Sequence, residues 1–361
     1  MIEKKKKQQK QEHEQAEGKN NIFQVAKLSG VSIATVSRVM SGKVYVSSEL
    51  TSRVKKAALT LGYCPNRSAS NLRKRVSKTI GVIISDIENP FFTSVIRGIE
   101  TILYDAGYSL LFCNSDEDPK REKTHLSILR AEDVAGIILT PTKNNNEFCK
   151  SLVESGIQLV AIDRSPGMDY MDGVTVKNKK GAFEATSHLA QLGYQRIGII
   201  CGPKQTSTSV ERLEGFKEAL LHHNLVLDQK LIIYSDFRQM GGYKAMQTLL
   251  DLEFPPIAVM VSNNLMTLGA LQAIHERNLK IPDQIAIVGF DDMPWATSLQ
   301  PSLTAVAQPA FDIGTTAAQL LLERLKDPTR SYRQVVLDTK LMVRTSSGSK
   351  MNLLIKPVNE T

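Results

Sequence analysis

Cysteine is scarce in this 361-residue sequence, and its four positions, Cys64, Cys113, Cys149 and Cys201, form no C-x-x-C pair. This spacing argues against a disulfide framework or a cysteine zinc site and favours reduced thiols in the cytosol. No apolar run approaches the ~20 residues that a membrane-spanning helix needs. Residues 1–20 are rich in Lys, Gln and Glu without an apolar core, so we expect a disordered tail, no secretory signal and no membrane partner.

Sequence signatures of common enzymes are also missing. We find no G-x-S-x-G elbow, no G-x-x-x-x-G-K-[ST] phosphate loop and no H-E-x-x-H motif. His275-Glu276 lacks a second histidine, and His222-His223 fits a solvated helix end. We therefore expect no catalytic residues, no metal site and no cofactor. An α/β enzyme and a solute-binding protein without a DNA role remain as alternatives.

Charge is distributed unevenly along the chain. Residues 1–78 hold 17 Lys or Arg against 5 Asp or Glu, whereas the remaining residues hold 28 against 32. A basic front on a mildly acidic body is typical of a DNA-binding head joined to an independent core. For Lys4–Lys7 alone, a solvated basic tail is the simpler interpretation.

Residues 22–42 have the pattern of two short helices joined by a tight turn. Apolar residues recur at helical spacing where the helices would meet, namely Val25, Ala26 and Leu28 in the first and Val36 and Val39 in the second. Gly30 is placed to end the first helix in left-handed backbone, and Ser32 is placed to cap the second. This pattern predicts a helix-turn-helix, whose second helix enters the DNA major groove.

The second helix starts with side chains suited to base edges and phosphates: Ile33, Ala34, Thr35, Ser37 and Arg38, to which we add the capping Ser32 as DNA contacts. Residues 25–41 resemble the DNA-binding headpiece of the LacI/GalR family of bacterial transcription regulators, which typically shows V-A-x-x-A-G-V-S-x-x-T-V-S-R-V-L-N. Ser29 replaces a common Ala, Met40-Ser41 replace Leu-Asn, and Gln24 stands where the family usually has Asp. These departures are small.

A third helix is predicted over 48–61, closed by Gly62, and it completes a headpiece of residues 21–64. The resemblance implies that residues 65–78 form a hinge helix and linker that pair across a dimer axis and enter the minor groove. It assigns DNA contacts there to Ala69 and to Leu72, the wedge that unstacks a base step. We add Asn66, which is placed to cap the hinge helix. Ser70 replaces a usual Arg. The alternative is a plain basic linker.

From residue 79 onward, short Val/Ile-rich runs alternate with amphipathic segments. The predicted strands are 80–84, 109–113, 136–139, 158–162, 197–201, 231–234, 257–261 and 285–288. Helices are expected between them, for example 91–106, 181–192, 209–222, 241–250 and 265–277. This alternation predicts an α/β core with parallel sheets covered by helices on both faces.

We expect two doubly wound subdomains within 79–345, followed by a C-terminal tail, 346–361. The first covers about 79–175 with part of 305–328, and the second covers 176–300 with part of 329–345. The helix 311–326 and the strand near 334–337 are thus expected to return to each half in turn. The arrangement resembles the periplasmic sugar-binding fold, and the overall resemblance runs from about residue 22 to 345.

Ligands of open α/β sheets bind beyond the carboxyl ends of the strands. Polar and aromatic side chains gather at these ends. By resemblance the effector contacts are Phe91, Asp163, Arg212, Phe237, Asn263 and Asp291, to which we add Arg164 after the fourth strand. Carboxylates, amides and arginine around aromatic faces suit a polyhydroxylated ligand. For each residue, a capping or core role is the alternative. Asn264 stands where the family most often has Asp.

These observations predict a sequence-specific transcriptional regulator, most often a repressor in this family. It is expected to bind pseudo-palindromic double-stranded operator DNA as a homodimer in the cytoplasm, at the nucleoid. A small-molecule effector, by class a sugar or sugar derivative, is expected to control DNA affinity from the cleft between the subdomains. Residues 346–361 contain no leucine heptads of the kind that join family dimers into tetramers, which favours a dimer.

Overall fold

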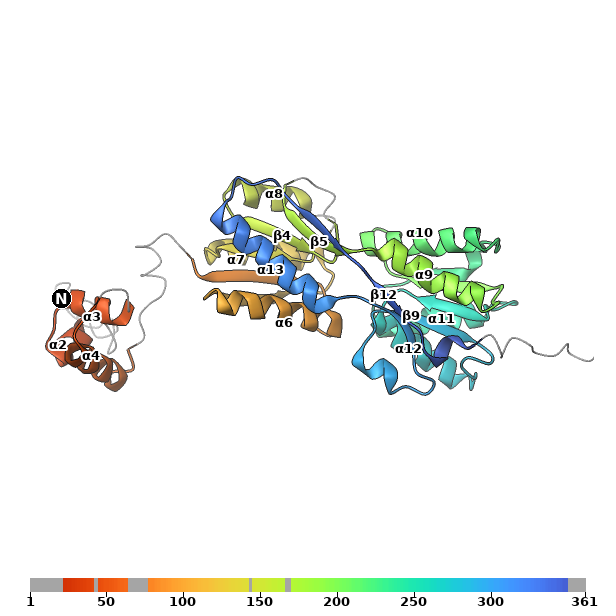
Figure 1. Ribbon diagram of the computed structural model, residues 1–361, viewed down its shortest axis with the longest axis horizontal. Helices are drawn as coiled ribbons and strands as arrows, with labels where there is room; N and C mark the ends of the chain where they lie inside the picture. Colours follow the sequence, from red (N-terminus) through yellow and green to blue (C-terminus); the bar gives the residue numbers. More distant parts are fainter. Residues whose placement is uncertain (1–21, 42–44, 64–76, 143–144, 166–169, 350–361) are drawn as a thin grey trace, which may run out of the picture. The chain divides into compact units, whose positions relative to one another are not determined.

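The computed structural model describes residues 22–41, 45–63, 77–142, 145–165 and 170–349, which form two compact units, 1–77 and 78–361. The predicted tail at 1–20, most of the predicted hinge and the end of the C-terminal tail lie outside the described residues. Figure 1 labels the helices and strands of both units. Each unit is described by itself below.

The first unit contains a three-helix headpiece, α2 (Ile22–Ser29), α3 (Ile33–Ser41) and α4 (Ser48–Thr60). Its core consists of small and β-branched side chains from all three helices: Val25, Ala26, Val36, Val39, Val54, Ala57 and Ala58. Such small side chains let short helices approach closely, although they bury little apolar surface in total. The predicted helix-turn-helix is confirmed.

The turn between α2 and α3 depends on Gly30, whose φ is +66°. A Cβ at this position would lie 2.7 Å from Nη2 of Arg53, and that same nitrogen donates to the Ser29 carbonyl oxygen at 2.7 Å. Ser32 accepts from the Thr35 amide at 3.1 Å and so caps α3 as predicted. Glycine therefore leaves room for the arginine that satisfies the end of α2.

The predicted apolar face of α2 was wrong at one position. Leu28 is 55% exposed, because the buried face of α2 is formed by Val25, Ala26 and Ser29. The Ser29 hydroxyl donates to the Val25 carbonyl oxygen at 2.5 Å, which allows a polar side chain to be buried there.

The second unit is a core of two lobes, each built on a six-stranded sheet. The first lobe has the strand order β11-β5-β4-β3-β1-β2. These strands are β1 (Thr79–Ile84), β2 (Ser109–Asn114), β3 (Gly136–Leu139), β4 (Gln158–Ile162), β5 (Asp172–Val176) and β11 (Gln334–Leu337). All neighbouring strands are parallel.

Helices cover both faces of this sheet (Figure 1). The side chains of its strands alternate between the two faces. Val82, Ile138 and Val160 face α6 (Pro90–Asp105) and α13 (Ala310–Lys326). Ile83, Ile137 and Leu159 face α7 (Pro119–Ala131) and α8 (Asn146–Glu154). Burial on both faces explains why the strands are continuous Val/Ile runs in the sequence.

The second lobe has the order β12-β10-β9-β8-β6-β7. Its strands are β6 (Ile197–Cys201), β7 (Ile232–Tyr234), β8 (Ala258–Val261), β9 (Ala286–Phe290), β10 (Thr304–Ala307) and β12 (Lys340–Met342). β12 runs antiparallel to β10. Helices α9 (Asn178–Gln191) and α10 (Ser207–His222) cover one face, and α11 (Gln239–Leu250) and α12 (Asn264–Glu276) cover the other.

The eight strands predicted before residue 300 are all present, to within two residues at each end. Three strands were missed. β5 begins Asp-Gly, β10 is the short Thr-Ala-Val-Ala, and β12 has three residues, so none carries the Val/Ile run that predicts a buried strand. Short 3₁₀ turns, η2 (Gln229–Leu231), η3 (Pro294–Thr297) and η4 (Thr345–Ser347), complete the second lobe.

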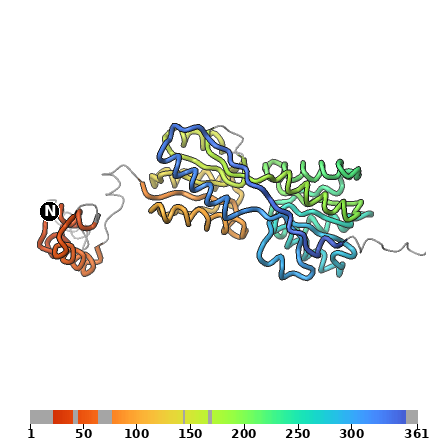
Figure 2. The backbone as a smooth tube through the Cα atoms, in the orientation of Figure 1, coloured from red at the N-terminus to blue at the C-terminus, as the bar shows by residue number. Residues whose placement is uncertain are grey.

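Within the described residues the chain passes between the lobes three times, at 176–178, 307–310 and 337–340 (Figure 2). Helix α13 packs in the first lobe, but the expectation that the strand 334–337 returns to the second half was wrong. β11 pairs with β5 of the first lobe, and β12 and β10 are the segments after residue 300 that join the second sheet.

A buried carboxylate explains why β11 stays with the first lobe. Asp172 of β5 is fully buried and pairs with Arg324 of α13 and with Arg330. It also accepts from the Arg333 amide at 2.7 Å, directly before β11. One carboxylate thus joins the end of α13, the following loop and β11.

Two serines assigned from the sequence to the C-terminal tail are packed into the second lobe. Ser346 donates to the Ile287 carbonyl oxygen at 2.7 Å and accepts from the Thr304 amide at 2.8 Å. The Ser347 hydroxyl lies 2.9 Å from Nε2 of His188. The second lobe therefore extends beyond the predicted boundary at residue 345.

Candidate functional site

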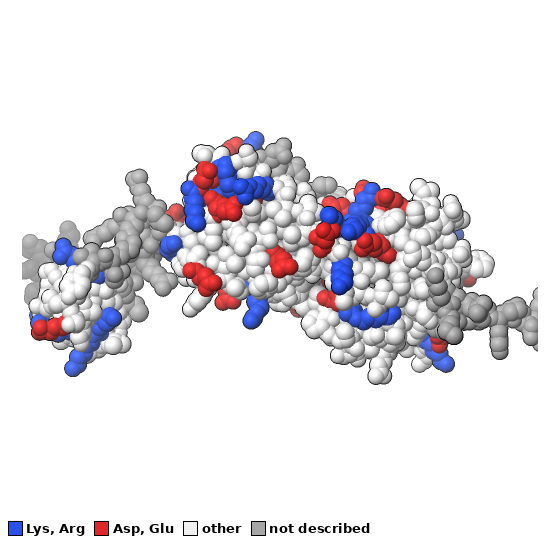
Figure 3. Space-filling model, in the orientation of Figure 1, with Lys and Arg blue, Asp and Glu red and all other residues white. Residues whose placement is uncertain are grey.

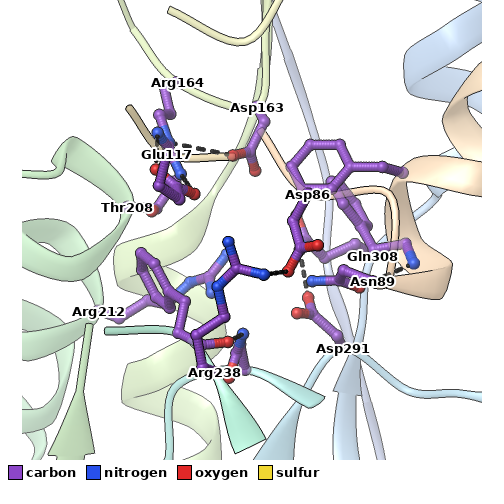
Figure 4. A pocket seen from close by; sticks show the side chains of 14 residues that line it. Asp86, Asn89, Glu117, Asp163, Arg164, Thr208, Arg212, Arg238, Asp291 and Gln308 are labelled. Carbon is purple, nitrogen blue, oxygen red and sulfur yellow. Dashed lines mark hydrogen bonds and ion pairs between the residues drawn. The ribbon is translucent and has the colours of Figure 1, made fainter. Parts of the chain in front are cut away.

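The carboxyl ends of the strands of both lobes meet at a cleft, which has an empty volume of about 420 Å³. The structure brings together all seven residues proposed as effector contacts: Phe91, Asp163, Arg164, Arg212, Phe237, Asn263 and Asp291. Figure 4 shows their polar groups converging on the cleft from both lobes.

Two aspartates, one from each lobe, provide the acidic groups of the cleft. Asp163 directly follows β4 with φ of +66°, and Asp291 directly follows β9 with φ of +72°. Left-handed backbone at a non-glycine residue is strained, and such strain is concentrated at functional sites. Both carboxylates are more than nine-tenths buried.

Burial raises the pKa of both aspartates above the usual range, although Arg212 opposes the shift at each. For Asp163 the pKa rises to about 6. A carboxylate that is costly to keep charged gains from hydroxyl donors, because hydrogen bonds to the ionised form stabilise it. The two aspartates are therefore well suited to accept hydrogen bonds from a polyhydroxylated ligand.

Arg212 projects into the cleft from α10 and is 3% exposed. Its Nε donates to the Asn178 side-chain oxygen at 2.8 Å, and Nη1 donates to the Ser262 carbonyl oxygen at 2.6 Å. The guanidinium carbon lies 3.8 Å from the centre of the Phe290 ring. These contacts hold the guanidinium as a rigid donor between Asp163 and Asp291. Burial lowers the pKa of Arg212, although both aspartates oppose this shift.

Arg164 is held within the first lobe by Glu117. Two hydrogen bonds of 2.8 and 2.5 Å join the guanidinium to this carboxylate, and Nε of Arg164 lies 3.5 Å from Asp163. The bidentate geometry orients Arg164 at the wall of the cleft. Glu117 was missed from the sequence because nothing local to it indicates its pair with Arg164, which lies 47 residues further along the chain.

Aromatic rings form the apolar surfaces of the cleft. Phe91 and Phe92 contact each other edge to face, with centroids 5.0 Å apart. The Phe237 ring lies over Gly202, where a Cβ would come within 2.1 Å of Cζ. Flat apolar faces beside carboxylates and arginine are a suitable surface for the C–H face of a sugar ring.

Gln308 also lines the cleft. It was not predicted, because the strand that precedes it, β10, was missed. Its Nε2 donates to Oδ1 of Asp291. Its Oε1 is buried and has no hydrogen-bond partner within the described residues. A buried acceptor without a partner is costly, so a ligand hydroxyl or amide donor is favoured at this point.

Thr208 and Arg238 complete the set that sequence reasoning missed, and both follow strands of the second lobe. Asp86, Asn89 and Phe92 also line the cleft; the sequence placed them after the first strand but did not include them among the contacts. Proximity to strand ends is the signal that finds most of this site. It does not say which of several polar residues in a loop faces inward.

In the headpiece, the proposed DNA contacts lie at and after the start of α3. Ser32, Ile33, Ala34, Ser37 and Arg38 are exposed, and Thr35 is half-buried. Asn66, Ala69 and Leu72 lie outside the described residues. The described headpiece residues carry five basic side chains, Lys27, Arg38, Arg53, Lys55 and Lys56, against Glu49.

The core has a different charge pattern. On the face in view in Figure 3, basic and acidic side chains of the core lie beside one another. Among the ion pairs of the core, Lys177 and Lys180 both pair with Asp338. Across the described residues, no group of three or more His, Cys, Asp or Glu side chains is placed to hold a metal ion. None of the described helices has the length and apolar character needed to cross a bilayer.

A helix-turn-helix headpiece joined to a two-lobed core with a polar cleft defines the class of ligand-responsive regulators. The family model for bacterial regulatory proteins of the lacI family matches residues 21–66, and the model for a periplasmic binding protein-like domain matches residues 186–347. The chain belongs to the LacI family of bacterial regulatory proteins.

Curated relatives cover almost the whole chain. The sequence is 36% identical to a ribose operon repressor of Halalkalibacterium halodurans over 91% of this chain and 98% of the relative. It is 31% identical to the transcriptional repressor PurR of Aliivibrio salmonicida over 90% of this chain and 98% of that one.

Solved structures agree with this assignment. The lac repressor dimer bound to operator superposes with a TM-score of 0.79 at 26% identity, covering 91% of this chain and 99% of that one. A LacI-family regulator from Enterococcus faecium with bound ribose gives a TM-score of 0.68 at 31% identity, covering 75% and 99%. The predicted fold class and family are confirmed.

Proposed function

We propose that this protein is a transcriptional repressor whose affinity for operator DNA is controlled by a neutral sugar of pentose size, with ribose as the first candidate. Its relatives are repressors rather than enzymes, and a non-catalytic role for this chain is part of the proposal. DNA as the target places its action in the cytoplasm, at the nucleoid.

The observation that carries the effector assignment is the convergence of Asp163, Asp291 and Arg212 on one small cleft. Two acceptor carboxylates and a fixed guanidinium suit vicinal hydroxyls, which both donate and accept. Four lining carboxylates against three arginines disfavour an anionic ligand such as a sugar phosphate. A relative named for the ribose operon and a related structure with bound ribose support this sugar as the first to test.

The headpiece supports the DNA-binding part of the proposal. We assign base and phosphate contacts to Ser32, Ile33, Ala34, Thr35, Ser37 and Arg38, and minor-groove contacts to Asn66, Ala69 and Leu72. A homodimer would present two copies of α3, so the operator is expected to be a pseudo-palindrome. The operator-bound dimer of the lac repressor supports this arrangement.

Isothermal titration and thermal unfolding test the effector. Ribose, ribose 5-phosphate, cellobiose and a nucleobase are added separately to the full chain. A ligand at 100 times its Kd adds ~2.7 kcal/mol to the stability of the form that binds it. We expect stabilisation by ribose and none by ribose 5-phosphate. Binding of the nucleobase or the phosphate instead of ribose would overturn the effector assignment.

Selection from a random DNA library tests the operator. We expect an enriched pseudo-palindrome whose affinity changes when ribose is added. The variant Leu72→Ala is expected to weaken binding to this site more than binding to unrelated DNA. An equal loss on both DNAs would contradict the wedge role, and enrichment of an asymmetric site would contradict the homodimer.

A further inference from the structure

The two walls of the cleft carry opposite charge. Among the described lining residues, the first lobe contributes Asp86, Glu117 and Asp163 with Arg164, whereas the second contributes Arg212 and Arg238 with Asp291. The first wall is therefore acidic and the second basic. Opposite potentials across an interface draw its two sides together.

Arg238 is the side chain that connects the two walls directly. It lies at the N-terminus of α11 in the second lobe. Its Nη1 is 3.1 Å from Asp86, which follows β1 of the first lobe. Its Nη2 forms a second ion pair with Asp116, which follows β2 of the same lobe. Figure 4 shows the bond from Arg238 to Asp86 at the cleft.

The first of these carboxylates has little access to water. The Asp86 side chain is 7% exposed, compared with 30% for Arg238 and 35% for Asp116. Removal of Arg238 would leave a nearly buried carboxylate without its cation, which is far more costly than the loss of an exposed pair. The backbone also holds Arg238 in place, because its amide donates to Asp236 at 2.9 Å.

A second hydrogen bond crosses the cleft nearby. Nδ2 of Asn264, the first residue of α12, donates to Oδ1 of Asn89, which caps α6. Both asparagines are buried. The lobes are thus joined at two points by their own side chains.

We propose that Arg238, Asp86 and Asp116 form a clasp that sets the fraction of closed core before any effector binds. Arg238 acts as a positioning residue, since it brings the effector contacts of the two lobes together through its ion pairs. Its influence on effector affinity rests on the proposed function, whereas its influence on closure does not. A clasp that favours the closed state lowers the conformational cost of effector binding.

The chain contains a matched control for this inference. Arg121 of α7 also pairs with Asp116, at 3.0 Å, but both residues belong to the first lobe. Arg121→Gln therefore removes the same charge from the same carboxylate without removing a bond between lobes. Arg121 does not line the cleft.

Closure is measured on the full chain without sugar, by pulsed electron spin resonance between labels at Glu132 and Glu253. These residues are exposed, one in each lobe, and noncanonical amino acids carry the labels so that the native cysteines stay unmodified. For Arg238→Gln we expect the closed-to-open ratio to fall about tenfold. We expect no change for Arg121→Gln.

A double-mutant cycle and a salt titration sharpen the result. Asp86→Asn should open the core less than Arg238→Gln, because the ion pair of Arg238 with Asp116 remains, and the double variant should open it no further than Arg238→Gln alone. Raising the salt concentration from about 0.05 to 0.5 M should open the wild type but not Arg238→Gln. An unchanged distance distribution in Arg238→Gln, or an equal change in Arg121→Gln, would overturn the clasp.

Ribose titration then separates the two proposals. Arg238→Gln should bind ribose about tenfold more weakly, and saturating ribose should restore the closed distances. If no variant binds ribose but the sugar-free distances change as expected, the effector assignment fails and the clasp stands. If ribose binds all variants equally and closure does not change, the clasp fails and the effector assignment stands.

Discussion

The two lobes of the core repeat one arrangement of strands with an aspartate at the cleft. They differ in the charged residue that follows this aspartate. In each lobe five parallel strands run in equivalent order, and an aspartate in left-handed backbone follows the equivalent strand, Asp163 after β4 and Asp291 after β9. The next residue differs. Arg164 lines the cleft and pairs with Glu117, whereas Asp292 does not line it and pairs with Arg344.

This difference separates what the ligand requires from what each lobe requires. A carboxylate at the same point on both walls is repeated, so we attribute it to ligand binding. The partner of that carboxylate varies, because each lobe needs only local compensation of a buried charge. The acidic character of the first wall comes from Asp86 and Glu117, and the basic character of the second from Arg212 and Arg238. This difference is the basis of the clasp.

The largest expected effect tests the equivalence of the lobes. Asp163→Ala and Asp291→Ala should each weaken ribose binding about 100-fold, since hydrogen bonds to a charged acceptor contribute ~1.5–3 kcal/mol each. Isothermal titration measures the affinities, and circular dichroism checks that the variants fold. A loss below about fivefold for one variant only would show that the lobes contribute unequally.

The next effect concerns a single cross-lobe bond. Asn89 Oδ1 already accepts from the Phe91 amide at 2.9 Å, and Asn264 Oδ1 accepts from the Leu265 amide at 2.7 Å. The bond between the two side chains therefore needs the Asn264 amide nitrogen as donor. Asn264→Asp should place acceptor against acceptor and weaken ribose binding about tenfold.

The control for Asn264→Asp is Asn278→Asp, which makes the same chemical change at an exposed residue of the second lobe. Titration of both variants measures the difference. Unaltered affinity in Asn264→Asp would remove this bond from the account of closure and leave Arg238 to bridge the lobes.

The dependence on pH should reveal Asp163. Burial raises its pKa to about 6, so its carboxylate is largely ionised at pH 7 and largely protonated at pH 5. Ribose affinity is expected to fall by up to about tenfold between these values if the ionised form accepts the hydroxyl bonds. Titration across this range measures it, and Asp163→Asn should flatten the curve between pH 5 and 7.

Stability should change in the opposite direction for the same group. An acid whose pKa is raised by folding binds protons more tightly in the folded protein. Its contribution to the ligand-free protein therefore becomes more favourable as the pH falls from 7 towards 4. The difference in Tm between the wild type and Asp163→Asn measures the contribution of Asp163 to stability. If this contribution and the ribose affinity both fell as the pH is lowered, the assignment would be contradicted.

The smallest expected effect concerns the residue after Asp291. Asp292 makes two hydrogen bonds to Arg344, at 2.7 and 2.8 Å. Asp292→Asn should lower the Tm by a few degrees, about 1–2 kcal/mol, and should leave ribose affinity within twofold. Arg164→Gln, the equivalent change in the first lobe, should weaken ribose binding. Melting curves and titrations compare them, and equal effects on affinity would erase the difference between the lobes.

Most of the fold could be predicted because strands buried on both faces are continuous apolar runs, such as Ile197–Cys201. The family resemblance selected the proposed contacts among the polar residues at strand ends, and they lie together because parallel strands end at one edge. Strands without such runs, β5 and β10, were missed, and with β10 the inward-facing Gln308. Leu28 was wrongly assigned to the buried face of α2. Ser29 lies on that face instead, because its hydroxyl donates to the Val25 carbonyl oxygen of the same helix.

Contacts between segments far apart in sequence could not be predicted. The ion pair of Arg238 and Asp86 joins loops of different lobes, and nothing local to either residue indicates the other. The position of β11 depends on Asp172, more than 160 residues earlier. Tertiary pairing of charges decides these features, and local pattern does not encode it.

The three passages of the chain between the lobes have a consequence for synthesis. The first lobe begins at β1, yet the face of its sheet formed by Ile138, Val160 and Ile162 is covered by α13, and its edge is completed by β11. On a ribosome, this apolar face stays uncovered until about residue 326 has emerged, and the second lobe is largely made by then. The sheet that starts first is covered only after most of the second lobe has been made, and a growing chain has to shield it in the meantime.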